Sequence, residues 1–178
     1  MKIELNENTL FTADTHFDHK FAAQMRHFDN TDDMNRAIVS DWNNKVSEQD
    51  TIIHAGDFCW HKRTIKNILP RLNGRIILVL GNHDRSMEKE YIHYGVETCL
   101  MATIKIQDVR IECCHFPLWA WDRMHHGAWH IHGHQHGDPT GIKGRIHDVG
   151  IDNNKGIISF AELRELIGEK EIRNHHGA

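Results

Sequence analysis

The sequence predicts an α/β sandwich that contains a mixed sheet. Strand and helix patterns alternate in the first half of the chain, and adjacent strands joined by short connections follow in the second half. The 178 residues, of which 39% are hydrophobic and 26% charged, are enough for one compact core. Since the chain has no linker, internal repeat or low-complexity block, we expect a single domain over residues 1–178.

Three apolar runs in the first half of the chain are predicted strands, and helical patterns follow them. The strands are expected over residues 9–13, 51–55 and 75–80. Apolar residues at helical spacing predict helices over residues 32–46, 63–69 and 87–94. Thr31 is the expected N-cap of the first of these helices. Such alternation is typical of parallel strands, which need a crossover connection between them.

The second half of the chain is predicted to be richer in strands. Four β-branched runs are expected strands, over residues 100–106, 109–114, 128–132 and 145–149. The first two flank Gln107-Asp108, a connection short enough for a hairpin. A capping box formed by Ser159 and Glu162 predicts a final helix, which ends near Gly168. Antiparallel strands are therefore added to a parallel set, and the sheet is mixed.

Charge and composition exclude several classes of protein. The 21 Lys and Arg against 25 Asp and Glu give a formal charge of −4, so we expect no broad basic surface for duplex nucleic acid or anionic lipid. No stretch approaches the ~20 apolar residues of a membrane-spanning helix, and the N-terminus lacks the apolar run of a signal peptide. We expect a cytoplasmic protein whose four cysteines are reduced. The sequence leaves the oligomeric state open.

Polar clusters begin where five of the predicted strands end, and they contain several of the chain's 17 histidines. In chain order they are Asp14-Thr15-His16, Gly56-Asp57, Gly81-Asn82-His83-Asp84, His115 and Gly133-His134-Gln135-His136. Ligands of open α/β sheets bind beyond the carboxyl ends of the strands, so these side chains are expected to converge on one site. Histidine is the commonest metal ligand, which makes metal chemistry the first expectation.

The donor set indicates the kind of metal. Two carboxylates, one amide oxygen and four imidazoles, with no thiolate, suit Mn, Fe, Zn, Co or Ni. Seven donors are too many for one tetrahedral ion but suit two ions roughly 3.5–4 Å apart if Asp57 bridges them. Two divalent ions, two carboxylates and a bridging hydroxide sum to a charge of about +1. Such a site favours an anionic substrate, and a phosphate ester fits it.

These five motifs, in this order, resemble those of the calcineurin-like metallophosphoesterase superfamily, and their immediate context resembles its small bacterial and phage members. The resemblance implies a four-layer αββα sandwich of mixed sheets flanked by helices. It also implies two ligand sets, Asp14, His16, Asp57 and His136 for one ion, and Asp57, Asn82, His115 and His134 for the other. Manganese is the first candidate for both ions. His83 would face the substrate, and Asp84 would either assist catalysis by orienting a neighbour or cap the following helix.

The expected function is dinuclear metal-dependent hydrolysis of a phosphoester by a metal-bridged hydroxide. We expect diesters to be favoured because many monoesterases of the family have Gly-Asp-x-x-Asp, whereas Trp60 occupies the position of the last Asp here. Without that carboxylate His83 is a weaker general acid, unless Asp18 or Asp84 substitutes for it in space. The alternatives are a phosphomonoesterase, protein phosphatases included, and a non-catalytic binding scaffold on the same fold.

The aromatic segment after His115 is a candidate substrate wall. Trp119 or Trp121 would stack on a base or an aromatic leaving group, and Arg123 would contact phosphate. Packing in the core is the open alternative for this segment. The expected partner is therefore a phosphate-ester substrate, such as a nucleotide or a nucleic-acid end, and no membrane.

Overall fold

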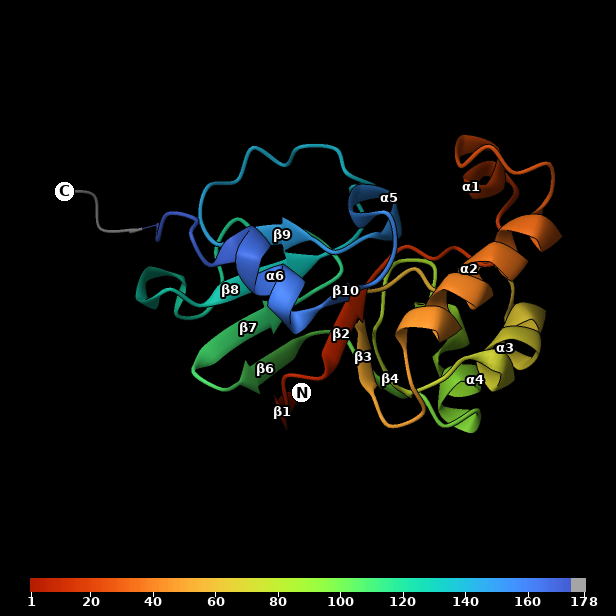
Figure 1. Ribbon diagram of the computed structural model, residues 1–178, viewed down its shortest axis with the longest axis horizontal. Coiled ribbons are helices and arrows are strands. Elements are labelled where there is room, and N and C mark those ends of the chain that lie inside the picture. The colour runs from red at the N-terminus through yellow and green to blue at the C-terminus, as the bar shows by residue number, and fades with distance from the viewer. Residues whose placement is uncertain (174–178) are drawn as a thin grey trace.

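Two five-stranded sheets face each other in the computed structural model, which describes residues 1–173 (Figure 1). The first sheet has the strand order β10-β2-β3-β4-β5, and β10 is its antiparallel member. Its strands are β2 (Thr9–Thr12), β3 (Thr51–His54), β4 (Arg75–Val79), β5 (Glu97–Cys99) and β10 (Ile158–Ser159). The predicted alternation of strands and helices in the first half of the chain is confirmed, and it forms the parallel part of this sheet.

The second sheet has the strand order β1-β6-β7-β8-β9. Its strands are β1 (Lys2–Leu5), β6 (Ala102–Ile106), β7 (Val109–Cys113), β8 (Trp129–His132) and β9 (Ile146–Asp148). The β6–β7 pair is the predicted antiparallel hairpin, and the β7–β8 and β8–β9 pairs are parallel. Both sheets are therefore mixed, as the sequence predicts.

The main core lies between the two sheets, because both present apolar side chains inward. Ile53 and Ile77 of the first sheet and Ile104, Ile111 and Ile131 of the second are fully buried in one cluster. Their burial removes apolar surface from water, which is the dominant favourable contribution to folding. The two sheets are thereby held face to face, with the carboxyl ends of β2, β3, β4, β7 and β8 close enough to share a site.

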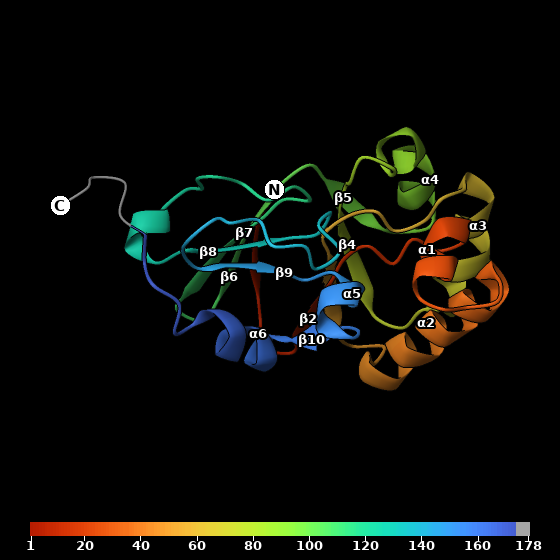
Figure 2. The same ribbon diagram turned by 90° about the horizontal axis from the view of Figure 1, so that it is seen from above.

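Helices cover the outer face of the first sheet and one edge of the sandwich (Figure 2). The helices on this side of the first sheet are α1 (Lys20–Met25), α2 (Thr31–Lys45), α3 (Lys62–Ile68) and α4 (Glu88–His93). The 3₁₀ turn η1 (Leu69–Arg71) follows α3, and the 3₁₀ turn η2 (Arg85–Met87) precedes α4. The last helices are α5 (Ile151–Asn154) and α6 (Phe160–Ile167), and α6 packs on β2, β9 and β10. None of the helices within residues 1–173 is long and apolar enough to cross a membrane.

The outer face of the second sheet is covered differently. A loop containing the 3₁₀ turn η3 (Met124–His126) folds over it, and Trp121, Met124 and Ala128 bury Ile146 there. The indole Nε1 of Trp121 donates a hydrogen bond to the Ala128 carbonyl at 2.8 Å. Trp121 is thus part of a small apolar cluster on this face.

Helix termini show where the sequence analysis was right and where it was wrong. The capping box of Ser159 and Glu162 is confirmed at the start of α6. The N-cap of α2 is Asn30, not Thr31, because the Asn30 side chain accepts the Asp33 N–H at 2.9 Å. Thr31 is instead the first residue of the helix. Both are good N-cap residue types, so adjacent candidates of this kind cannot be ranked by propensity.

Candidate metal centre

The seven predicted metal ligands lie on loops that leave the carboxyl ends of β2, β3, β4, β7 and β8. The backbone of these loops is unusual, because five of the seven residues have positive φ, a region that side chains other than glycine rarely adopt. These five are Asp14 at 56°, His16 at 48°, Asp57 at 58°, His134 at 70° and His136 at 50°. Backbone strain of this kind concentrates at functional sites, where it aims side chains that regular structure would turn away.

The structure places six of these residues in two adjacent groups. Asp14, His16 and His136 form one group, and Asp57, His115 and His134 form the other; within each, the ligand atoms lie within 4.8 Å of one another. Each group takes residues from both sheets. This is a geometry that can hold two metal ions side by side.

Asp57 lies between the two groups. Its Oδ2 is 3.3 Å from His115 Nε2 in its own group and 3.8 Å from His16 Nε2 in the other. The seventh predicted ligand, Asn82, is also here, with its Oδ1 3.1 Å from His115 Nε2. The position of Asp57 is the one that a bridging carboxylate needs.

Two buried polar atoms of the first group fit a bound cation. Among residues 1–173, Asp14 Oδ1 and His16 Nδ1 are buried without any hydrogen-bond partner. The other oxygen of Asp14, Oδ2, accepts the His134 N–H at 2.9 Å, so the carboxylate is held in place with one oxygen available. Leaving a buried polar atom unsatisfied is costly, and coordination of a metal would satisfy it.

The surroundings of Asp14, His16 and Asp57 shift the pKa of each of these side chains. Burial raises the pKa of Asp14 to about 7, although the charges of His115 and His136 oppose the shift. Burial lowers the pKa of His16 to about 3, so its imidazole is neutral at pH 7, the form that binds metals. Burial alone would raise the pKa of Asp57, but the hydrogen bond and charge of His115 outweigh it and lower this pKa to about 2.

The buried carboxylate of Asp84 joins the loops after β3 and β4 by hydrogen bonds to their backbones. Its carboxylate accepts the backbone N–H groups of Asp57 at 2.6 Å, Phe58 at 3.0 Å and Gly81 at 2.9 Å. It also accepts the hydroxyl of Tyr91 at 2.8 Å. The side chain is fully buried, and although Asp84 is the N-cap residue of η2, its carboxylate forms no capping hydrogen bond there. Asp84 therefore orients the backbone of Asp57, which is the first of the two predicted roles.

Glycines make room for the ligands at two points. A Cβ at Gly81 would collide with the carboxylate and the backbone N–H of Asp57. A Cβ at Gly133 would lie 2.6 Å from Asp14 Oδ2 and 2.7 Å from the side chain of Ala13. Any other residue at these two positions would push a predicted ligand out of place.

Asp152 of α5 is a residue that the sequence analysis missed. Its Oδ2 is 2.8 Å from His136 Nδ1, and its two oxygens accept from Arg26 Nε and Nη2 at 2.7 and 2.8 Å. Arg26 also donates to the backbone carbonyl of Asp14 at 2.6 Å. A carboxylate on the second nitrogen of a histidine ligand fixes its orientation and raises its basicity. No local pattern marks Asp152, because only the tertiary fold brings it to His136.

We expect Asp152→Asn to weaken metal binding by about tenfold to a hundredfold, because His136 loses its charged partner. Chelator competition with a single metal measures the affinity directly. The matched control is Asp138→Asn, the same change at an exposed position two residues after His136. Equal affinities of the Asp152 variant and the wild type would show that this carboxylate does not support the metal centre.

His83 lies at the open side of the two groups with a partly exposed ring. Its Nε2 is 3.8 Å from Asp57 Oδ2, and its ring centroid is 4.6 Å from that of Trp60. Trp60 in turn stacks on His19, with centroids 3.9 Å apart. The two carboxylates considered as substitutes face elsewhere, since Asp18 accepts from Thr64 and Asp84 is occupied as described. Trp60, which occupies the position of the last Asp in Gly-Asp-x-x-Asp, therefore packs its indole on the ring of His83.

Exposed aromatic groups lie beside the first metal group on the side of α1. A small cavity of about 100 Å³ there is lined by His16, His19, Phe21 and Met25, among others. The side chains of Phe21 and Trp60 are 62% and 38% exposed. These residues were not predicted to bind substrate, although an aromatic residue shortly after a metal motif is a signal that the sequence offers.

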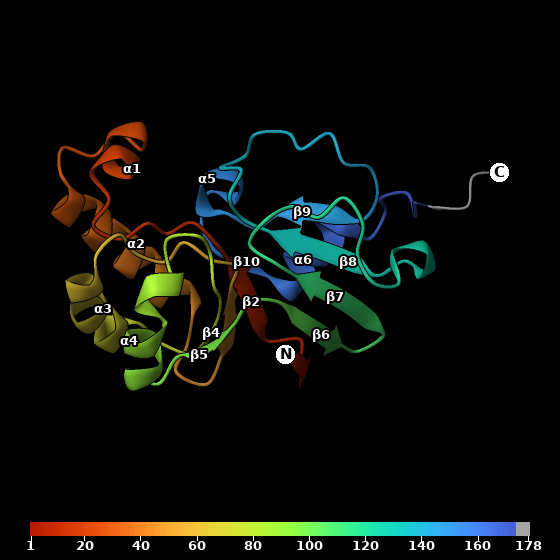
Figure 3. The same ribbon diagram turned by 180° about the vertical axis from the view of Figure 1, so that it is seen from behind.

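The three residues predicted to bind substrate do not join the metal groups. They belong to the connection between β7 and β8, which runs back along the second sheet, away from α1 and α5 (Figure 3). Trp121 is buried in the apolar cluster on the second sheet, and Trp119 stacks under the Arg173 guanidinium at 4.2 Å. Arg123 lies just before η3, next to the amino-terminal ends of β7 and β8. Of this segment, Phe116 is next to the site, 4.6 Å from the His134 ring. Packing, the open alternative for this segment, accounts for Trp121.

Comparisons with known proteins agree with this geometry. Among protein families, the calcineurin-like phosphoesterase superfamily domain matches residues 8–161. An uncharacterized protein of Methanocaldococcus jannaschii is 30% identical over 129 residues, which are 70% of this chain and 66% of that protein. The chain therefore spans just under two thirds of that relative's length.

Two solved structures share the fold. A protein of unknown function from Aquifex aeolicus has a TM-score of 0.71 at 24% identity, covering 89% of this chain and 98% of its own. The nuclease MPE of Pseudomonas putida has a TM-score of 0.50 at 17% identity, covering 73% and 62%. The family domain spans most of the chain and includes both groups of residues that could hold a metal, so this protein belongs to the calcineurin-like phosphoesterase superfamily.

Proposed function

We propose that this protein is a dinuclear metal-dependent phosphoester hydrolase that prefers diesters. The observation that carries the proposal is the pair of buried Asp/His groups with Asp57 between them. Asp14, His16, Asp57 and His136 would hold one ion, and Asp57, Asn82, His115 and His134 the other. Two divalent ions in these positions, with manganese proposed first, would activate water at neutral pH and neutralise charge on the phosphoryl group.

The remaining residues of the site position the substrate and move a proton. His83 is next to the ion sites with a side chain 35% exposed, so its Nε2 is available to protonate the oxygen of a leaving group. Trp60 rather than a carboxylate packs on its ring, so the motif supplies no acidic partner that would orient the imidazole as a general acid. Diesters with good leaving groups depend least on this acid, which is why we propose them as the preferred substrates.

The aromatic side chains beside the first group suggest what such a diester carries. The rings of His19, Phe21 and Trp60 lie together beside this group, with the His19 centroid 5.2 Å from that of His16. A planar base or aryl group stacks on such faces with about 1–3 kcal/mol per base. A nucleotide or a nucleic-acid end is therefore the substrate class we propose, and residues 1–178 are proposed to act as one domain.

His83→Ala should lower kcat/KM by about 10²–10⁴-fold for esters with poor leaving groups and far less for aryl esters, because only the former need the proton. The measurement is kcat/KM of metal-reconstituted protein for matched mono- and diesters across a series of leaving-group pKa values. The wild type should prefer bis(p-nitrophenyl) phosphate to p-nitrophenyl phosphate. A preference for the monoester, or an equal loss in the variant across the series, would favour a phosphomonoesterase. Absence of turnover with every ester would favour a binding scaffold.

A further inference from the structure

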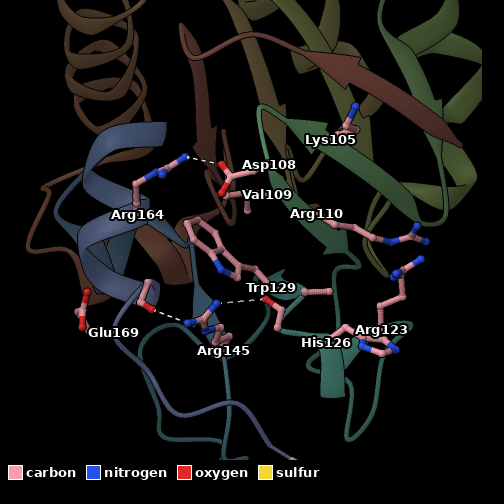
Figure 4. Close-up of a pocket in the computed structure, with 13 residues that line it drawn as sticks. Lys105, Asp108, Val109, Arg110, Arg123, His126, Trp129, Arg145, Arg164 and Glu169 are labelled. Carbon is pink, nitrogen blue, oxygen red and sulfur yellow. Dashed lines mark hydrogen bonds and ion pairs between the residues drawn. The ribbon is translucent and has the colours of Figure 1, made fainter.

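A basic cavity lies at the end of the second sheet that is remote from the metal groups. It has a volume of about 700 Å³ and is bounded by the start of β7, β8 and β9, by η3 and by the end of α6 (Figure 4). Five cationic side chains line it: Lys105, Arg110, Arg123, Arg145 and Arg164. The carboxylates in its lining are Asp108 and Glu169. The lining therefore sums formally to about +3 in a chain whose formal charge is −4. Just outside the lining, Glu4 pairs with Lys105, and Glu112 and Asp122 pair with Arg110.

Two of the five cations have no acidic partner. Arg145 donates to the backbone carbonyls of Gly168 at 2.8 Å, Lys170 at 3.2 Å and Gly127 at 3.5 Å, which fix its guanidinium without neutralising it. The exposed Arg123 forms no ion pair with the part of the chain that the structure describes, and its backbone is left-handed with φ 59°. The other three are paired, as Arg164 is with Asp108 at 3.4 Å. Positive charge is thus concentrated on two arginines at the mouth and wall of one cavity.

This cavity and the candidate metal centre lie at opposite ends of β8. Trp129, which lines it, is the first residue of β8, and the metal-ligating His134 follows five residues later. At about 3.3 Å per residue, the two positions are roughly 16 Å apart. A phosphate held in the cavity therefore cannot be the one that is hydrolysed.

We propose that this cavity binds a compact anion carrying two or more phosphate groups. Arginine presents a planar fork of donors that matches phosphate, and the exposed Arg123 can supply it. Arg145 adds a positive charge that its backbone contacts hold in place without neutralising it. The volume falls within the roughly 300–1,000 Å³ of sites for small molecules. Trp129 is only 3% exposed, so its indole is not available to stack on a base, and recognition rests on the anionic groups. The proposal is independent of the hydrolytic function, because it uses none of the metal-ligating residues.

The test is a titration of the metal-loaded protein with fructose 1,6-bisphosphate, followed by calorimetry and by backbone amide shifts with diamagnetic Zn²⁺ as the metal. We expect binding of one equivalent, with the largest shifts at residues 126–129 and 168–169. Arg123→Ala should raise the Kd by about tenfold or more, since a charge-assisted contact is lost. The matched control, Lys89→Ala on α4, removes one exposed cation from the opposite side of the molecule and should leave the Kd unchanged.

A second arm separates this proposal from the proposed function. Asp57→Asn disables the metal centre, so bisphosphate binding that persists in this variant with the same shifts supports the cavity even if turnover is lost. Shifts confined to residues 14–16, 82–84 and 134–136, or an unchanged Kd in Arg123→Ala, would overturn the proposal. Tighter binding of a 12-nucleotide single-stranded DNA with the same shifts would also overturn it, in favour of a polymeric ligand.

Discussion

Asp57→Asn should abolish most of the hydrolytic activity and weaken both metal ions together. Its carboxylate is within 3.8 Å of a histidine of each group, so removal of its charge is felt at both ion positions. We expect a fall of at least about a hundredfold in kcat, the scale seen when one group that stabilises a transition state is removed. Metal content and kcat are measured together on the same reconstituted samples.

The control for this variant is Asp41→Asn, the same change on an exposed face of α2. Loss of one ion with full retention of the other would place Asp57 in a single group rather than between two. Wild-type turnover with one ion or none would contradict the dinuclear mechanism altogether. His16 and His115 provide the confirming pair, because substitution of either should affect chiefly its own group.

Asp84→Ala should cost about 3–5 kcal/mol of the free energy of unfolding, which is the scale for removing one partner of a buried charged network. Three backbone N–H groups and the Tyr91 hydroxyl would lose their acceptor at once. Urea denaturation of the metal-free protein measures this loss without a contribution from the ions. A smaller loss is expected for Asp84→Asn, since its one remaining oxygen still accepts.

Asp84→Ala should also bind metal more weakly than the wild type, because Asp84 fixes the backbone of Asp57. Tyr91→Phe is the useful comparison, since it removes a single donor from the same carboxylate and leaves the loops after β3 and β4 tied together. An unchanged free energy of unfolding in Asp84→Ala would mean that water accepts the backbone N–H groups in place of the carboxylate. That result would contradict a structural role for this residue.

The candidate site could be located from the sequence because its residues follow strand ends. Asp14, Asp57, Asn82, His115 and His134 are far apart in the chain, but each comes directly after an apolar run or within three residues of its end. Parallel strands place their carboxyl ends at one edge, so topology alone predicts that such residues meet. The apolar runs and the helical spacing of apolar residues also gave the boundaries of these strands and helices to within a few residues.

The supporting residues could not be predicted, because their roles depend on contacts between distant segments. Asp152 lies in a short polar helix near the end of the described chain, and nothing local distinguishes it from an exposed Asp. The strands β1, β5 and β10 were missed because none of them contains a run of apolar residues, and each gains its order from its neighbours. Trp121 and Arg123 were assigned from proximity to His115 in sequence, whereas the loop carries them away along the second sheet.

Each metal group takes its residues from both sheets, and this has a consequence for folding. An ion held by Asp14, His16 and His136 joins the start of the chain to its last third, and the second group joins Asp57 to His115 and His134 in the same way. The ions would therefore act as cross-links between the two sheets, in addition to the apolar packing and to hydrogen bonds such as that from the His134 N–H to Asp14 Oδ2. At a metal concentration a hundred times the Kd, each ion adds about 2.7 kcal/mol to stability, so the supply of metal in the cell would set the lifetime of the folded protein as well as its activity.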